Sequence, residues 1–563
     1  MGSQALASTA RTDPYSLLFR SAMNEKCPAD ELAPDTTEPC RVCLVKRYSD
    51  RRELLVIPAL ARSKPVTRTT PEWPAWPKPH QVLSGALFEP RPSLRKLVVL
   101  IDAELLAATD DFTLSPKVVL SGLLTHPYIK LLRYRDEGPF ANTPRRSYGP
   151  QGTGLTAAEG WAELLPPDDR EGRDLIYADV SGPIYTGIFG SRAEYARRDH
   201  ATAIYRELDA EAAADRRERD ALAAEVAEAV HADLYITERP YLFATQALQA
   251  QRVTLCRTPE ALALVGLYLR SQNEYIIWRA ADGSGSYSMN EGLYYWVGSR
   301  ELLPTAWRWF SACVQESRAA GDDTLLDLGQ SLLRLVQRAL EARDRFHRTF
   351  SLPQNNDTAR SVLSELDSIL VSLMGAVDSS ARVAHMVLGL PGNLHDAGWQ
   401  RNQRWLPQIA AHEPMLAALF DADTPHYHTL TIVRLLRNTI HGQMMRTIAV
   451  QQGARPQETV IRLPGQDEAT ILTSIDALGG QAAWGVRSAA NGSSLVDPGV
   501  FVERLFLNVL ALLNAVMGRT PVERLSHVRL TPAHSQPPPV RRAGEADTFS
   551  ERNRLSIRWQ LGF

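Results

Sequence analysis

The chain has 563 residues, too many for a single hydrophobic core, so we expect two to four domains. Its content of 44% hydrophobic and 22% charged residues is ordinary for a globular protein. Because 62 Lys and Arg stand against 64 Asp and Glu, the net charge of −2 excludes wholesale electrostatic attraction to nucleic acid or to an anionic membrane.

The cysteine content and the apolar segments bear on the compartment. Five cysteines in 563 residues are typical of a reducing environment. The first residues, MGSQALASTARTDPYSLLF, lack the continuous apolar core of a signal peptide. The apolar run LFLNVLALLNAVMG from Leu505 is too short to span a bilayer and follows Glu503 and Arg504, so we expect a buried helix. These features predict a cytoplasmic protein without membrane contact.

Residues 1–95 predict an irregular N-terminal region with short strands at RVCLVKRY and ELLVIPALA. Cys27, Cys40 and Cys43 form a C-x12-C-x2-C pattern, and the last two have the spacing of a zinc knuckle. With one distant histidine, the three thiolates could complete a tetrahedral structural zinc site. Free cysteines are the competing interpretation, because a second CxxC pair is missing.

Residues 96–256 predict an α/β domain. The run KLVVLID predicts a buried strand that ends at Asp102 and leads into a helix. Residues 174–181 and 234–237 predict further buried strands, and the charged, Ala-rich residues 194–231 predict one or two solvated helices. This alternation is typical of a parallel sheet with ligand sites at the carboxyl ends of its strands.

Residues 257–452 carry helical periodicity and predict an all-α domain of about six helices. We expect its Gly/Ser-rich residues 279–292 to form an exposed, mobile loop. Residues 453–563 predict a small α+β region. Its expected strands are ETVIRLP, ATILTSIDAL, AAWGVRS and, after a flexible linker, LSIRWQLGF; its expected helix runs from about Asp497 to Gly518. The whole is a multidomain α+β chain.

The segment RLLRNTIHGQ, residues 434–443, places four polar side chains on an otherwise apolar helix. At about 100° per residue, Arg434, Arg437, Asn438 and His441 fall on one face. Histidine moves protons near neutral pH, and arginine binds phosphate oxygens in bidentate fashion. Because RNA supplies its own nucleophile, the 2′-hydroxyl, these groups could cleave it without a metal. A polar stripe satisfied by internal partners is the alternative.

This segment resembles the signature of the HEPN superfamily, all-helical domains that include many metal-independent ribonucleases. Their motif is an arginine, often followed by Asn, Asp or His, and then a histidine after four to six residues. Arg434 and His441 form R-x6-H, whereas Arg437-Asn438 has the preferred RN pair at a shorter spacing, so both arginines remain candidates. The resemblance implies that His441 is the general acid/base, the arginines are phosphate ligands and Asn438 is an orienting residue.

The same resemblance implies a metal-independent endoribonuclease that needs no cofactor. It implies an RNA substrate and a homodimer or higher oligomer. It also implies a bacterial toxin or antiphage-defence effector, which responds to a protein partner or a phage-derived trigger.

Acids in the α/β region resemble those of PIN-like nucleases, which begin with strand-Asp and carry a late ADxxxTxD strand. Asp102 matches the first element, and Asp233 with Thr237 and Glu238 matches the second, with Glu in place of the last Asp. The resemblance implies a Mg²⁺ or Mn²⁺ site formed by Asp102, Asp233 and Glu238. Pairing of each acid with a nearby arginine, Arg239 in the case of Glu238, is the structural alternative. A third interpretation of the chain is a non-catalytic module that binds a nucleotide or a protein.

Overall fold

The computed structural model describes most of the chain from residue 96 onward. The described residues are 96–107, 111, 113–135, 158–165, 175–179, 183–187, 191–200, 203–244, 253–352, 354–400, 404–440, 445–450, 458–489, 492–538 and 548–563. The chain divides into two compact units, Met1–Trp73 and Pro74–Phe563, and all described residues belong to the second. The strands predicted before residue 96, and the zinc site predicted at Cys27, Cys40 and Cys43, lie outside the described residues.

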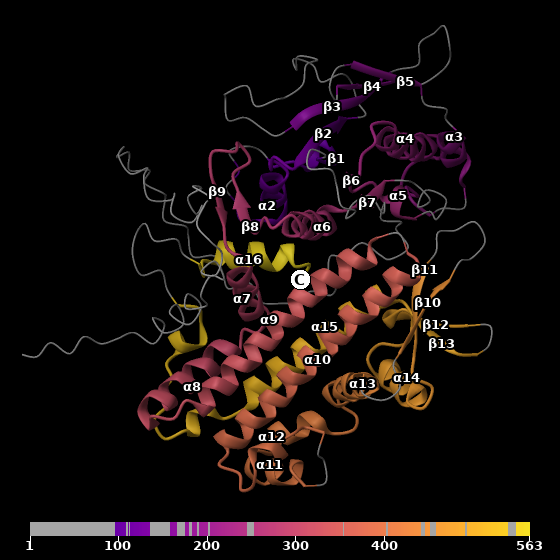
Figure 1. Cartoon of the computed structure of the whole chain (residues 1–563). Helices are drawn as coiled ribbons and strands as arrows, with labels where there is room; N and C mark the ends of the chain where they lie inside the picture. Colours follow the sequence, from indigo (N-terminus) through magenta and orange to yellow (C-terminus); the bar gives the residue numbers. More distant parts are fainter. Residues whose placement is uncertain are drawn as a thin grey trace, which may run out of the picture. The chain divides into compact units, whose positions relative to one another are not determined.

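A seven-stranded sheet, of order β5-β4-β3-β2-β1-β6-β7, organises the first part of this unit (Figure 1). Its strands are β1 (Leu97–Asp102), β2 (Ile129–Arg135), β3 (Ala158–Leu165), β4 (Leu175–Asp179), β5 (Pro183–Gly187), β6 (Leu234–Ile236) and β7 (Thr254–Cys256). Strands β3, β2, β1, β6 and β7 pair in parallel, and β4 and β5 add an antiparallel edge. The predicted α/β fold with a parallel sheet is confirmed. The strand order reverses direction between β1 and β6, where ligand crevices of such sheets lie.

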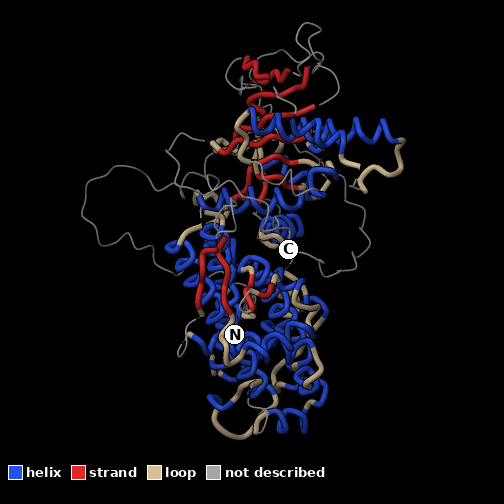
Figure 2. The backbone as a smooth tube through the Cα atoms, turned by 90° about the vertical axis from the view of Figure 1, so that its right-hand side faces the viewer, coloured by secondary structure: helices blue, strands red, loops and turns tan. Residues whose placement is uncertain are grey.

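Helices cover both faces of the sheet (Figure 2), which explains why β1 is an uninterrupted apolar run. Leu97, Val99 and Ile101 pack toward the helices α2 (Pro116–Leu123) and α6 (Thr258–Ser271). Leu100 points to the other face, toward α3 (Ser191–Arg198) and the Ala-rich α4 (Ala210–Ala229). One or two solvated helices were predicted within the charged segment; two are present, and α4 has one long buried face and is not solvated all round. A short helix, α5 (Pro240–Ala244), follows β6.

The next part of the unit is mainly helical. Its helices are α7 (Glu291–Leu302), α8 (Ala306–Ala320), α9 (Thr324–Phe350), α10 (Asn356–Val387), α11 (Leu406–His412), α12 (Pro414–Ala417) and α13 (Pro425–Thr439). The long helices α9 and α10 lie side by side (Figure 1). The loop predicted at residues 279–292 is in part a hairpin, because β8 (Ile276–Arg279) pairs with β9 (Ser286–Ser288).

A four-stranded antiparallel sheet, of order β10-β11-β13-β12, follows α13. Its strands are β10 (Arg446–Val450), β11 (Glu458–Arg462), β12 (Val486–Ser488) and β13 (Ser494–Val496), and the accompanying helices are α14 (Glu468–Ala477), α15 (Pro498–Arg519) and α16 (Glu551–Gln560). The predictions of a strand at ETVIRLP and of the long helix after Asp497 are confirmed. The division of the chain into four domains stays a prediction.

Two predicted strands in this region are wrong, because both segments are helices. ATILTSIDAL forms most of α14, where Ile471 and Ile475 are buried one helical turn apart. LSIRWQLGF contributes to α16, which begins at a cap: the Ser550 hydroxyl accepts a hydrogen bond from the Asn553 N–H. Burial at the helical spacing overrides the β propensity of the isoleucines and threonines.

Within the described part of the chain, one helical stretch is long and apolar enough to cross a membrane: α15 with its continuation to Arg524. Of its most apolar window, 61% is buried inside the protein. The core helix of a globular protein can have the same length and apolar composition. The partial burial of this stretch agrees with the buried helix predicted here.

A cluster of buried charges joins α9 to α15. The fully buried Arg343 donates to both carboxylate oxygens of Glu503, at 2.6 and 2.5 Å, and His347 Nε2 lies 2.5 Å from the same carboxylate. Burial alone would raise the pKa of Glu503, but Arg343 and His347 outweigh it and hold the pKa at about 2. The remaining nitrogen of the Arg343 guanidinium, Nη1, donates a hydrogen bond to the Leu561 carbonyl at 2.7 Å.

The segment around α16 also reaches the sheet region. Gln560 Nε2 donates to the Ile277 carbonyl at 2.9 Å, and Arg270 Nη1 donates to the Gln560 carbonyl at 3.2 Å. Arg270 in turn forms a buried ion pair with Asp344 at 2.6 Å, next to Arg343 on α9. Buried charges on α6, α9 and α15 and the backbone carbonyls of Gln560 and Leu561 therefore form one connected set of interactions.

Removing Arg343 from this cluster should cost stability, because the buried Glu503 would lose its guanidinium partner and keep only His347. We expect Arg343→Met to lower the free energy of unfolding by about 3–5 kcal/mol. The matched control is Arg345→Met, two residues away on α9, since Arg345 is 49% exposed and pairs with Glu365 at 3.0 Å. A surface pair contributes about 1 kcal/mol or less. Thermal or denaturant unfolding measures both, and equal losses would contradict a central role for the buried pair.

Candidate functional site

Helix α13 is fixed in place by one apolar face. It begins with a cap, in which the Thr424 hydroxyl accepts from the Tyr427 N–H at 3.2 Å. Ile432, Val433 and Leu436 are buried, and α13 contacts α10, α14 and α15. This burial orients the remaining side of the helix toward the surface.

The predicted polar stripe lies on that remaining side. Arg434 and Arg437 are half-buried, and Asn438 is exposed. Within the described residues, no hydrogen bond or ion pair engages the side chains of these three residues. The alternative interpretation, a polar stripe satisfied by internal partners, therefore finds no support at these three residues among the described part of the chain. His441 follows the helix end by two residues and lies outside the described residues.

A pocket of about 620 Å³ opens beside α13, a size suited to a small ligand. Four residues of α13 line it: Tyr427, Leu430, Thr431 and Arg434. These positions recur every three or four residues, and Arg437 and Asn438 continue the same series one turn further. The pocket and the polar stripe are thus neighbouring parts of one helix face.

The opposite wall carries a histidine whose tautomer is set by its neighbour. His385, near the end of α10, is only 6% exposed, and its Nδ1 accepts a hydrogen bond from Trp405 Nε1 at 3.1 Å. Burial lowers the pKa of His385, while the carboxylate of Asp396 opposes that shift. The imidazole is therefore neutral near pH 7 with its proton on Nε2. Among the described residues, none accepts a hydrogen bond from this Nε2–H.

Packed aromatic rings hold this wall rigid. Trp405 meets Trp399 edge-to-face at 4.7 Å between ring centroids, and Trp399 stacks on Phe420 at 4.4 Å. Trp399 Nε1 also donates to the Ser380 hydroxyl at 2.9 Å. Since both indole N–H groups are satisfied and the rings are buried, His385 presents a fixed donor.

The charges of the pocket favour an anion. Arg404 and Arg434 line it, and the one carboxylate among its lining residues belongs to Asp396. Neither arginine forms a hydrogen bond or an ion pair with another described residue. With His385 neutral, two guanidiniums face one carboxylate, and guanidinium binds phosphate or carboxylate groups in bidentate fashion.

The structure does not bring the three predicted metal ligands together. Asp102 ends β1, whereas Asp233 precedes β6 and binds the other end of β1: its Oδ2 accepts from the Val98 N–H at 2.9 Å. In the parallel pair, Val99 faces Leu234, so about 13 Å of strand separates the level of Asp233 from Asp102. The expectation that these two carboxylates share one metal ion is not met by this register.

Glu238 is engaged elsewhere. Its Oε1 accepts from the Thr258 N–H at 3.1 Å, and its nearest guanidinium is that of Arg257, at 3.9 Å. Arg239, the partner predicted for Glu238, pairs with Asp102 instead, at 3.2 Å. Within the part of the chain that the structure describes, no three His, Cys, Asp or Glu residues gather as metal ligands.

Asp102 is the centre of a buried polar network at the carboxyl ends of β1 and β6. Its Oδ1 accepts from the Tyr235 hydroxyl at 2.7 Å, and its Oδ2 accepts from the Thr237 hydroxyl at 2.6 Å. Arg239 Nε approaches both oxygens, and its Nη1 reaches Asp220 at 3.3 Å. Because each oxygen of Asp102 already accepts two hydrogen bonds, this network has the character of a structural ion pair.

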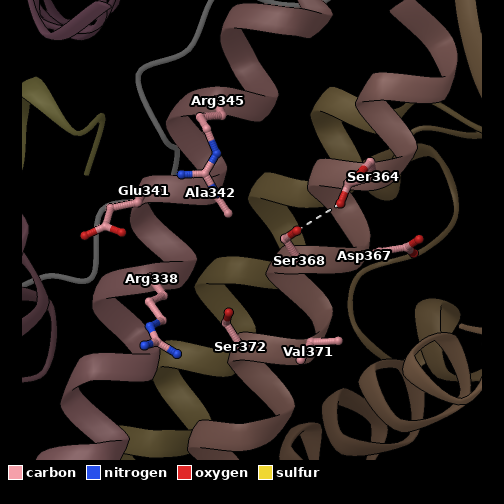
Figure 3. Close-up of a pocket in the computed structure, with 9 residues that line it drawn as sticks. All are labelled: Arg338, Glu341, Ala342, Arg345, Ser364, Asp367, Ser368, Val371 and Ser372. Carbon is pink, nitrogen blue, oxygen red and sulfur yellow. Dashed lines mark hydrogen bonds between the residues drawn. The ribbon is translucent and has the colours of Figure 1, made fainter. Parts of the chain in front are cut away.

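A second, more open groove lies between α9 and α10 (Figure 3). It has a volume of about 460 Å³, and Ser364, Ser368 and Ser372 follow its α10 side. The Ser368 hydroxyl donates to the Ser364 carbonyl at 3.0 Å, so it is already satisfied within its own helix. The groove has two arginines and two carboxylates among its lining residues, which gives it no excess charge. The pocket beside α13 is the stronger candidate site.

No protein-family model matches the chain, and no curated protein or solved structure matches it either. The function must therefore be inferred from the geometry of this site and from the motif on α13.

Of the residues that line the pocket, the sequence predicted only Arg434. Those that it missed include His385, Arg404 and Trp405. They come from two segments that lie 29 to 49 residues before Arg434 along the chain. The sequence around Arg404, RNQRWLPQ, has two arginines beside a tryptophan. Nothing in this pattern alone predicts that Arg404 and Trp405 line a pocket with residues of α13.

The buried network around Asp102 generates a stability prediction. We expect Asp102→Asn to lower the free energy of unfolding by about 3 kcal/mol, because Arg239 loses one of its two buried counter-charges and keeps only Asp220. Glu238→Gln, at an exposed carboxyl, is the control and should change stability by less than about 1 kcal/mol. Unfolding is followed with and without Mg²⁺. Unchanged stability of Asp102→Asn, together with loss of a Mg²⁺-dependent stabilisation in both variants, would contradict the structural role.

Proposed function

We propose that this chain is a metal-independent endoribonuclease whose active site lies on the exposed stripe of α13. One observation carries the proposal: Arg434 and Arg437 lie one turn apart on a helix that is otherwise packed into the core, and neither has a partner among the described residues. Unpaired guanidiniums held on a rigid element are suited to binding a phosphate group.

In this proposal the arginines act on the phosphate and the histidine acts on protons. The 2′-oxygen of the substrate attacks phosphorus, the bond from phosphorus to the 5′-oxygen breaks, and a 2′,3′-cyclic phosphate and a 5′-hydroxyl result. Arg434 and Arg437 offset the charge that develops on the phosphate oxygens. His441, three residues after Asn438, takes the proton from the 2′-hydroxyl or gives one to the leaving oxygen. Asn438 orients the imidazole or the ribose.

The wider role rests on the motif resemblance alone. On that basis we propose a HEPN-like helical domain that acts as a homodimer or higher oligomer in the cytoplasm. It would be a toxin or an antiphage-defence effector that a protein partner or a phage-derived signal activates. A second copy of the stripe would supply a second histidine and further positive charge.

Cleavage of a mixed RNA pool in EDTA tests the proposal. The wild type should cut and leave 2′,3′-cyclic or 3′-phosphate ends, which end-group analysis detects. We expect His441→Ala and Arg434→Gln each to slow cleavage by about a hundredfold or more. Arg360→Gln is the matched control, because Arg360 is an exposed arginine on α10 without a partner among the described residues.

Cleavage that requires Mg²⁺ and survives His441→Ala would contradict the proposal and move the chemistry to another part of the chain. If RNA binds without being cut, and Arg434→Gln weakens that binding, the stripe is a binding surface and not an active site.

A further inference from the structure

The pocket beside α13 has the features of a built ligand site. Its wall is rigid, because Trp405 is locked between Trp399 and His385. His385 lines the pocket with a largely buried side chain, and its Nε2–H has no acceptor among the described residues. This N–H is a hydrogen-bond donor that a ligand in the pocket can use.

One part of the pocket suits a phosphate. The two guanidiniums that line it, of Arg404 and Arg434, come from different segments, and the one carboxylate among the lining residues, that of Asp396, offsets only one of the two charges. Arg434 also belongs to the stripe on which the cleavage chemistry is proposed. A phosphate bound by Arg434 would therefore lie where the pocket and the stripe meet.

Other lining residues of the pocket suit a planar, polar ring. Tyr427 contributes a half-buried aromatic ring, and Asn393, Gln400 and Gln408 contribute amides that both donate and accept hydrogen bonds. Proteins recognise unstacked bases with these groups: an aromatic ring for the base face, and amide or imidazole groups for the base edge. The volume of about 620 Å³ accommodates one nucleotide.

We propose that this pocket binds a single unstacked nucleotide of the RNA substrate, the one next to the phosphate that is cut. Arg404 and Arg434 hold its phosphate, while Tyr427, His385 and the amides contact its base. The inference rests on the proposed ribonuclease function and adds base selectivity to it. Selectivity arises because the four bases differ in the acceptors that they offer to the His385 donor.

Calorimetric titration of the full-length protein with the four 3′-mononucleotides, and with inorganic phosphate, tests this inference. We expect one base to be preferred, and phosphate alone to bind at least about tenfold more weakly. Arg404→Gln should weaken binding of the preferred nucleotide by about ten- to a hundredfold, since it removes charge-assisted hydrogen bonds. Arg360→Gln should bind like the wild type: it lies 25 residues before His385 on α10, about 37 Å away along the helix. Unchanged thermal unfolding of Arg404→Gln shows that it folds.

Three results would overturn the inference: no mononucleotide binds, Arg404→Gln binds as well as the wild type, or phosphate binds as tightly as the nucleotides. A non-cleavable RNA with 2′-fluoro groups in place of the 2′-hydroxyls should displace the bound mononucleotide. Failure to displace it would mean that the pocket serves a free nucleotide, which also overturns the inference.

The two proposals fail in different ways. If nucleotides bind through Arg404 but RNA is never cut, the ribonuclease function is wrong and the nucleotide site stands. If RNA is cut equally after all four bases and no mononucleotide binds, the pocket inference alone is wrong.

Discussion

The ion pair between Arg343 and Glu503 is the interaction on which the helical part of this protein depends. Both side chains are buried, so neither charge is tolerable without the other. The pair fixes α9 against α15, and the same guanidinium holds the carbonyl of Leu561 after α16. Next to it on α9, Asp344 holds Arg270, which extends the constraint to α6 beside the parallel sheet. Specific charge partners thus determine how these helices meet.

The position of the candidate site follows from that arrangement. Helix α13 packs on α10 and α15, and both of these contact α9. Once these helices are fixed, the apolar face of α13 packs against α10 and α15. Arg434 and Arg437 then lie on the side of α13 that faces the surface. The same packing sets the end of α10 opposite α13, which brings His385 and Trp405 to the pocket wall. A rigid scaffold therefore supports Arg434 and Arg437, whose side chains have no partner among the described residues.

Local pattern predicted much of the fold, and tertiary contacts decided the rest. Strand periodicity was enough to predict β1 from its apolar run. Helix periodicity was enough to predict that Arg434, Arg437 and Asn438 share one face of a helix. The errors at α14 and α16 arose where β-branched residues are buried on a helix. Asp233 was wrongly grouped with Asp102, because the register of β1 against β6 cannot be obtained from either strand alone. The pocket residues opposite α13 required long-range packing, which no single segment encodes.

An experimental structure with a bound RNA analogue tests the central claim most directly. The analogue is a short single-stranded RNA with 2′-fluoro in place of the 2′-hydroxyl at each position, so that the attacking oxygen is absent and the strand is not cut. The account predicts a backbone phosphate within hydrogen-bond distance of the Arg434 guanidinium, with the 2′ carbon facing His441. RNA bound away from α13, for example at the carboxyl ends of β1 and β6, would contradict it.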